Sequence, residues 1–445
     1  MRDFTKEQST KELSFFLFPM LFSVTFQRIY SLINTAVISQ YLSYTAVAVI
    51  GSCQAFVSIQ EFIFLGMTTG FGFYIFRCIG VKDTDTFRLG LWGALYLTGF
   101  LAVIGIIFSV FSGFFLKLMN VPPVLWTDTR RYLFFLMAGS GFLGLKNLLF
   151  CIVQGLGDSA FSGFLSMAGI IMLTGITVLL IAGLRMGVEA SALAVLLNNV
   201  LQCLCLILYL FRNYRNRLRY TAFWKLSWSV IRQLLNSGIA KSGMMILVGI
   251  GSIIMQRAIN KMTSEQIAAN TYASSVSTFF MYLISAYGTA AGIISGQNMG
   301  NRNLKNIKNY NRRLLIRCGW VCLLVCFLCI GQAHWILRLL TGPEVAERII
   351  HTGAQWLCIC CLGYPGLSLL LISRNALQAM GAHRILPFLG ILEMTVNILL
   401  AGFVPYYGPL AVSMSVVLKW SIPGIISFVG YHRIIKKHEA QWAGE

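Results

Sequence analysis

Charged side chains are scarce in this sequence. Asp, Glu, Lys and Arg make up only 11% of its 445 residues, whereas a soluble protein carries about 25%. Apolar residues make up 57% instead. This balance excludes an ordinary soluble protein and favours a chain that is embedded in a membrane.

The motifs of common enzyme classes are also missing. The sequence has no G-x-x-x-x-G-K-[ST] phosphate-binding loop and no H-E-x-x-H zinc motif. No nucleophile with a neighbouring base can be identified. We therefore expect no enzymatic activity, no direct use of ATP and no cofactor.

Apolar runs of about 20 residues recur along the chain, which is the length that a helix needs to cross ~30 Å of hydrocarbon. Closed barrels also span membranes, but their strands are ~10-residue segments of alternating polarity. We therefore predict an all-α integral membrane protein with twelve transmembrane helices. The predicted spans are residues 13–38, 46–76, 89–111, 132–153, 160–183, 188–211, 239–259, 266–296, 314–337, 353–378, 385–405 and 408–430.

Acidic residues are fewer than basic ones, 15 against 35, which gives a net charge of +20. The basic residues gather in alternate connections between spans, as the positive-inside rule requires. With the N-terminus inside, 22 lie on the inner side, 8 on the outer side and 5 within spans. We therefore expect a multi-pass protein of the cell inner membrane with both termini in the cytoplasm. The lipid bilayer is its expected partner, and nucleic acid is not.

The chain repeats itself at an offset of about 221 residues. Residues 18–80 and 238–300 share one plan of apolar run, short hinge, second apolar run and basic loop. Farther on, LKLMNVPPV at 116–124 matches LRLLTGPEV at 337–345. Internal duplication of this kind must be recognised before any finer assignment.

Each repeat holds six spans, so the second repeat begins on the same side of the membrane as the first. We predict two six-helix lobes, related by a pseudo-twofold axis along the membrane normal, around a central cavity. Transporters that work by alternating access have this plan. The predicted domains are an N-lobe at 1–211, a basic cytoplasmic linker at 212–237 and a C-lobe at 238–445.

Two acids lie within the predicted spans, Glu61 and Glu393, one in each lobe. A carboxylate in hydrocarbon costs roughly 2–3 kcal/mol or more, so it indicates a function. One interpretation is that at least one of them takes up and releases a coupling proton. The other is a static ion pair, formed by Glu61 with Arg28 or Lys146 and by Glu393 with Lys419.

The charge balance of the spans bears on the substrate. Three basic residues, Arg28, Lys146 and Lys419, lie at mid-membrane, and only two acids do. The predicted central cavity therefore does not favour cations. Arg374 and Lys241 lie nearer the inner helix ends, and we expect them to extend to the membrane surface. The substrate is expected to be amphipathic or even anionic.

Several other polar residues in the spans are candidates for lining a substrate cavity. Each could instead form a hydrogen bond between helices, worth about 0.6 kcal/mol on average. The candidates are Gln27, Arg28, Gln54, Asn198, Gln256, Tyr282 and Asn397.

Short motifs throughout the chain resemble those of the multidrug and toxic compound extrusion (MATE) family. They are Pro19, Tyr30 to Asn34, Q-G-x-G-D at 154–158, Q-R-A-I-N at 256–260, I-A-A at 267–269 and G-Q-N-M-G at 296–300. The resemblance implies efflux of organic, often amphipathic compounds, driven by inward flow of Na⁺ or H⁺. The wider group includes flippases for lipid-linked saccharides.

The sequence departs from that family where its ion site is expected. Many members have an Asp on the first helix, and the best-aligned residue here is Asn34, which cannot ionise. Many have an Asn and an Asp on the fifth helix, where this chain has Leu173 and Thr177. The candidates for cation coupling are therefore Glu61, Glu393 and Asn34.

Three functions stay open at this point. The first is a secondary exporter of drugs and toxins by antiport with H⁺ or Na⁺, acting as a monomer on a small amphipathic molecule. The second is a lipid or lipid-linked saccharide flippase of the same superfamily. The third is a membrane protein that is not a transporter, such as a receptor or a channel.

Overall fold

A computed structural model describes residues 4–5, 12–22, 44–118, 125–215, 218, 226–340 and 347–443. In these ranges the backbone forms helices and no strand. Ten helices of the described part are long and apolar enough to cross a membrane, and a bent pair of helices makes an eleventh. The all-α class that the apolar runs predict is therefore confirmed. Of the span predicted at 13–38, residues 13–22 are described, and they belong to the short apolar helix Glu12–Phe22; residues 23–38 lie outside the described part.

Contacts divide the chain into two compact units, Met1–Ser242 and Gly243–Glu445. The boundary falls inside one long helix, α9, which begins earlier than the predicted span at 239–259. Residues 228–237 of the predicted linker are therefore helical. The assignment of separate lobes and a cytoplasmic linker stays a prediction.

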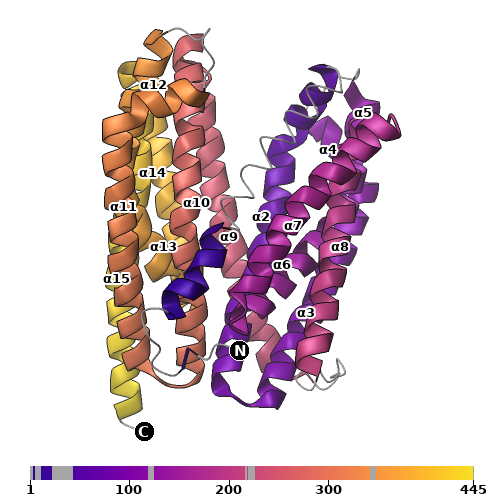
Figure 1. Ribbon diagram of the computed structural model, residues 1–445, viewed down its shortest axis with the longest axis vertical. Coiled ribbons are helices and arrows are strands. Elements are labelled where there is room, and N and C mark those ends of the chain that lie inside the picture. The colour runs from indigo at the N-terminus through magenta and orange to yellow at the C-terminus, as the bar shows by residue number, and fades with distance from the viewer. Residues whose placement is uncertain are drawn as a thin grey trace. The chain divides into compact units, whose positions relative to one another are not determined.

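Besides the short helix Glu12–Phe22, the N-terminal unit contains seven α-helices, one π-helical turn and the first part of α9 in its described residues (Figure 1). The elements are α2 (Tyr44–Val81), α3 (Thr84–Val110), α4 (Ser112–Leu118), α5 (Trp126–Ala138), α6 (Ser140–Gly155), α7 (Ser159–Val178), η2 (Leu179–Gly183), α8 (Glu189–Tyr214) and α9 (Trp228–Ile259). Its main apolar core is formed by α2, α3, α6 and α8, with Val230 and Leu234 of α9.

The C-terminal unit contains the rest of α9 and six further helices in its described residues (Figure 1). These are α10 (Ser264–Gly300), α11 (Leu304–Leu340), α12 (Glu347–Cys361), α13 (Tyr364–Ala379), α14 (Ile385–Tyr407) and α15 (Pro409–Ala443). Helices α12 and α13 meet at an angle of 45° and form the bent pair. Helix α13 packs against α10, α11 and α15, so it lies at the centre of this unit.

The two units repeat the same backbone details. Gly157 after α6 and Gly381 after α13 have φ angles of 88° and 89°. Each glycine closes its helix with the same pair of backbone hydrogen bonds. In the first bond of each pair, the glycine N–H donates at 3.0 Å to a carbonyl oxygen, Gly157 to that of Gln154 and Gly381 to that of Gln378. A left-handed residue at this position is a common helix terminus and is most easily provided by glycine. The duplication seen in the sequence therefore extends to turn geometry.

The Gly-rich segment of α2 lies directly against the start of α9. A Cβ atom on Gly70 would come within 2.5 Å of the Gly238 Cα atom and of the Ser237 carbonyl oxygen. The Ser237 hydroxyl donates a hydrogen bond of 2.7 Å to the carbonyl oxygen of Gly70. Small residues allow such close contact between helices in a membrane, where no hydrophobic force drives them together.

Large apolar side chains cover much of the outside of both units. Phe164 and Ile171 on α7 are 68% and 73% exposed, and Phe327 on α11 is 76% exposed. Such surfaces would be a liability in water, but they suit the hydrocarbon of a bilayer.

Candidate functional site

The C-terminal unit encloses a partly open cavity of about 230 Å³. This volume is somewhat below the ~300 Å³ lower end of typical ligand pockets, so it fits a small ligand or one end of a larger one. The cavity is lined by Ser252, Met255, Gln256, Ile259, Asn270, Ser274, Ser277, Thr278, Met281, Trp356, Cys360, Asn397, Val412, Ser415, Val416, Lys419 and Trp420.

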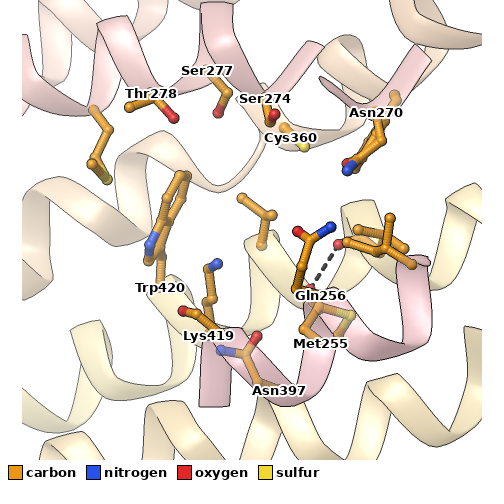
Figure 2. Close-up of a pocket in the computed structure, with 17 residues that line it drawn as sticks. Met255, Gln256, Asn270, Ser274, Ser277, Thr278, Cys360, Asn397, Lys419 and Trp420 are labelled. Carbon is orange, nitrogen blue, oxygen red and sulfur yellow. Dashed lines mark hydrogen bonds between the residues drawn. The ribbon is translucent and has the colours of Figure 1, made fainter. Parts of the chain in front are cut away.

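Two walls of different character face each other across this cavity (Figure 2). Helix α10 supplies one of them, with the hydroxyl groups of Ser274, Ser277 and Thr278. Helices α9, α14 and α15 supply the other, which carries larger amide, ammonium and aromatic groups. The cavity therefore offers many hydrogen-bonding groups beside apolar rings and methionines.

Lys419 is the only charged residue among the described residues that line the cavity. It is half-buried, and its Nζ atom lies 5.6 Å from the centre of the Trp420 ring. That distance is within the ~6 Å range of a cation–π contact. Within the described part of the chain, no carboxylate forms an ion pair with Lys419.

Two buried groups of the lining have no hydrogen-bond partner in the described structure. Asn397 is 1% exposed, and neither its amide nitrogen nor its amide oxygen is bonded. Trp356 is 3% exposed, and its Nε1 atom is likewise unbonded. Buried polar groups normally have a partner, so such exceptions call for a water molecule or a ligand.

A buried ion pair lies one helical turn from Asn397, on the same side of α14. The Arg374 Nη1 atom donates to Glu393 Oε1 at 3.1 Å, and the side chains are 11% and 6% exposed. Lys419 also interacts electrostatically with Glu393, but at a longer range. The static pair expected between Glu393 and Lys419 is thus replaced by one with Arg374.

Two expectations for basic residues near the inner helix ends are wrong. The Arg374 side chain is only 11% exposed, because α13 is surrounded by other helices of its unit and Glu393 holds its guanidinium. Lys241 is 8% exposed, and its Nζ atom lies 5.8 Å from the centre of the Phe73 ring. Packing, which the position along the helix does not reveal, keeps both of them inside.

The N-terminal unit contains a second polar cluster. Lys146 donates a hydrogen bond of 2.6 Å to Asn199 Oδ1 and interacts electrostatically with the half-buried Glu61. Asn147 beside it donates to the Thr68 hydroxyl at 2.8 Å. Lys146, one of the two partners that the sequence suggests for Glu61, is therefore close to it.

The structure places the predicted site residues in different surroundings. Gln256 and Asn397 line the cavity, Glu393 lies one turn away, and Asn198 is buried in the N-terminal unit. Tyr282 is next to a lining residue but is not part of the lining. Gln27, Arg28 and Asn34, and the side chain of Gln54, lie outside the described residues.

The two positions singled out on the fifth predicted span, Leu173 and Thr177, lie in α7. Thr177 is 1% exposed and donates its hydroxyl to the carbonyl oxygen of Leu173 in its own helix, at 2.8 Å. Leu173 is buried and apolar. Neither of these two side chains carries a negative charge.

The sequence indicates Lys419 as one of the charges at mid-membrane and as a possible partner of Glu393. It does not indicate Trp356, which lines the same cavity. A tryptophan in a span gives no such signal, because tryptophans also occur at membrane surfaces.

Cysteines at C-x-x-C spacing occur on both α11 and α12, at 326–329 and 358–361. Such spacing is typical of zinc sites. Here Cys326 donates to the Cys361 carbonyl oxygen at 3.1 Å, and Cys358 to that of Cys329 at 3.6 Å. No group of three metal ligands exists among the described residues, so these thiols pack the two helices together.

The MatE family model matches residues 19–181 and 242–403, once in each half of the chain. The probable multidrug resistance protein YoeA of Bacillus subtilis (strain 168) is 23% identical over 361 residues, which cover 78% of this chain and 77% of that protein.

Solved structures of transporters share the fold. An outward-facing multidrug resistance MATE family transporter of the MOP superfamily matches with a TM-score of 0.87 and 18% identity, over 98% of both chains. A MOP superfamily transporter from Pyrococcus furiosus, reported with a binding pocket of reverse polarity, matches with a TM-score of 0.86 and 19% identity, over 98% of both chains.

Proposed function

Because the chain belongs to the multidrug and toxic compound extrusion (MATE) family of membrane transporters, we propose that it is a secondary active exporter. It moves amphipathic organic compounds, such as drugs and toxins, out of the cell by alternating access. Inward movement of H⁺ or Na⁺ supplies the energy. The chain is thus a multi-pass transporter and not an enzyme.

The observation that carries this proposal is the cavity of the C-terminal unit and the ion pair beside it. Unbonded groups of Asn397 and Trp356 can hold a ligand, and Met255 and Met281 give the lining an adaptable apolar part. A transporter of varied amphipathic compounds needs this combination of polar anchors and deformable apolar surface.

We assign coupling to the two acids within the spans, Glu61 and Glu393. Glu393 is one turn from the cavity residue Asn397 and is held by Arg374. Protonation of Glu393 would remove the charge that Arg374 faces and would change the hydrogen bonding next to the ligand. Glu61 is placed in the same way beside Lys146 in the N-terminal unit. Asn34 stays a candidate for Na⁺ through its amide oxygen.

The remaining parts of the proposal concern location and assembly. The distribution of basic residues supports an inner-membrane protein with both termini in the cytoplasm. The two repeats supply both lobes within one chain, which supports a monomer as the working unit.

The test is transport by the purified chain in liposomes. A fluorescent amphipathic drug is followed while a pH gradient or a Na⁺ gradient is imposed, each with the other ion balanced. We expect a gradient of one of the two ions to drive drug movement several-fold faster than no gradient. Equal rates with and without both gradients would contradict the proposal.

Glu61→Gln combined with Glu393→Gln provides the matched variant. Below its lowered unfolding midpoint it should still insert and elute as a monodisperse protein, but it should lose proton-driven transport. Normal transport by this double variant would make the two acids structural.

A further inference from the structure

We propose that the cavity of the C-terminal unit binds the negatively charged end of an amphipathic substrate, with Lys419 as its counter-ion. The proposal rests on the proposed function and names its substrate class. The binding site that it assigns combines the Lys419 ammonium with the unbonded groups of Asn397 and Trp356, and has Trp420 as a ring for the apolar part.

The charge around the cavity favours an anion. Among the described residues of the C-terminal unit, the other acids are paired near the helix ends: Glu265 with Arg348, Glu347 with Arg338, and Glu439 with Lys308. The acid inside, Glu393, forms its ion pair with Arg374. One positive charge, that of Lys419, is therefore left over in the interior. An ammonium in such a position is costly unless an anion compensates it.

The hydrogen-bonding groups of the lining also favour an anion. The Asn397 amide and the Trp356 indole nitrogen are buried, unbonded and part of the same lining as Lys419. The amide –NH₂ and indole N–H are donors, and so is the ammonium. Figure 2 shows Lys419 and Asn397 on one wall, opposite the hydroxyl groups of α10. Donors around a charged nitrogen match a carboxylate, sulfonate or phosphate.

The same features exclude the opposite charge. An organic cation would be repelled by Lys419 and would find no carboxylate in the described lining. A Na⁺ ion would require several oxygen ligands and, in most hard-cation sites, carboxylates. The volume of about 230 Å³ admits an anionic group with one aromatic ring but not a whole large drug.

Equilibrium binding tests this without any transport step. The chain is placed in nanodiscs of phosphatidylcholine and dialysed against benzenesulfonate or against phenyltrimethylammonium, which has the same ring and the opposite charge. We expect the sulfonate to bind at least tenfold more tightly. Lys419→Gln should weaken sulfonate binding by about tenfold or more, since a hydrogen bond to a charged group is lost, and Lys419→Arg should keep it within a few-fold.

Two further variants complete the design. Trp356→Phe keeps an aromatic side chain, although a smaller one, and removes the N–H donor, so a several-fold loss of sulfonate affinity is expected. Lys261→Gln removes an exposed lysine of the same unit and should change nothing. If Lys419→Gln fails to fold, the sulfonate affinities of Lys419→Arg and Trp356→Phe still test the proposed anion site. Equal binding of the two compounds, or sulfonate binding unchanged in Lys419→Gln and Trp356→Phe, would overturn the proposal.

A free anionic solute and the phosphate of a lipid headgroup share this chemistry. Nanodiscs with increasing phosphatidylglycerol separate the two sources. If phosphatidylglycerol competes with the sulfonate, and this competition disappears in Lys419→Gln, the occupant of the site is a lipid. If phosphatidylglycerol does not compete, the occupant is a soluble anion. Because no ion gradient is present, failure of driven transport would leave these results standing.

Discussion

At the scale of single residues, polarity inside an apolar span is the most informative signal of the sequence. It selected Gln256, Asn397 and Glu393, and the structure places these three in or beside one cavity. It could not select the partner of Glu393. Arg374 is on another helix, 19 residues away along the chain, and only the packing of α13 against its neighbours brings the two together.

The Arg374–Glu393 pair allows a prediction on stability. Glu393→Gln leaves the buried guanidinium without its carboxylate, and removing one partner of a buried pair costs about 3 kcal/mol or more. Arg374→Gln should cost less, because Lys419 remains within electrostatic reach of Glu393. The variant that combines Arg374→Gln with Glu393→Gln should recover most of the lost stability. Thermal unfolding in detergent, followed by the remaining monodisperse fraction, measures all three.

An exposed ion pair of the same unit serves as the control. Arg338 donates to Glu347 at 2.7 Å, and these side chains are 44% and 63% exposed. Surface pairs contribute about 0–1 kcal/mol, so Arg338→Gln should hardly shift the unfolding midpoint. A Glu393→Gln variant as stable as Arg338→Gln would show that the buried pair contributes nothing.

At the scale of helices, the sequence predicts which segments are helical better than where they begin. Hydropathy locates the apolar part of α9 but not its start at Trp228, because the first turns carry Arg232, Gln233 and Asn236. These residues are still helical because Val230 and Leu234 are buried in the N-terminal core. Tertiary contacts therefore extend the helix beyond its apolar segment.

The close contact of α2 with α9 gives a prediction for a helix pair. Gly70→Leu would force its side chain into the backbone of Gly238, so the helices must separate. We expect a loss of about 1–3 kcal/mol, as for other overpacked sites, and a lower unfolding midpoint. Gly99→Leu is the matched control, because a Cβ atom on Gly99 meets nothing within 4 Å. Equal midpoints for the two variants would contradict the packing.

At the scale of the whole molecule, length and hydropathy predict a bundle of spans, and the described helices agree. The duplication is visible in the sequence because both halves keep the same turns. The placement of one half against the other depends on interactions that leave no periodic pattern, so the pseudo-twofold axis along the membrane normal stays a prediction.

The direction of the two repeats can be tested by labelling from each side of the membrane. Lys82 lies between α2 and α3 with a φ angle of 62°, and Arg302 lies between α10 and α11 with a φ angle of 53°. Each is followed by a side chain that accepts a backbone hydrogen bond at the start of the next helix, Asp83 at 3.0 Å and Asn303 at 3.0 Å. The two connections are therefore equivalent.

Repeats with six spans each put equivalent connections on the same side. A membrane-impermeant maleimide should thus label Lys82→Cys and Lys305→Cys only after the inner face is opened, whereas Lys261→Cys, at the other end of α10, should be labelled from outside. All three positions are exposed, and the unchanged chain controls for its own thiols. Labelling of Lys82→Cys and Lys305→Cys from opposite sides would contradict this prediction. It would mean that each half has an odd number of spans and that the second repeat is inverted.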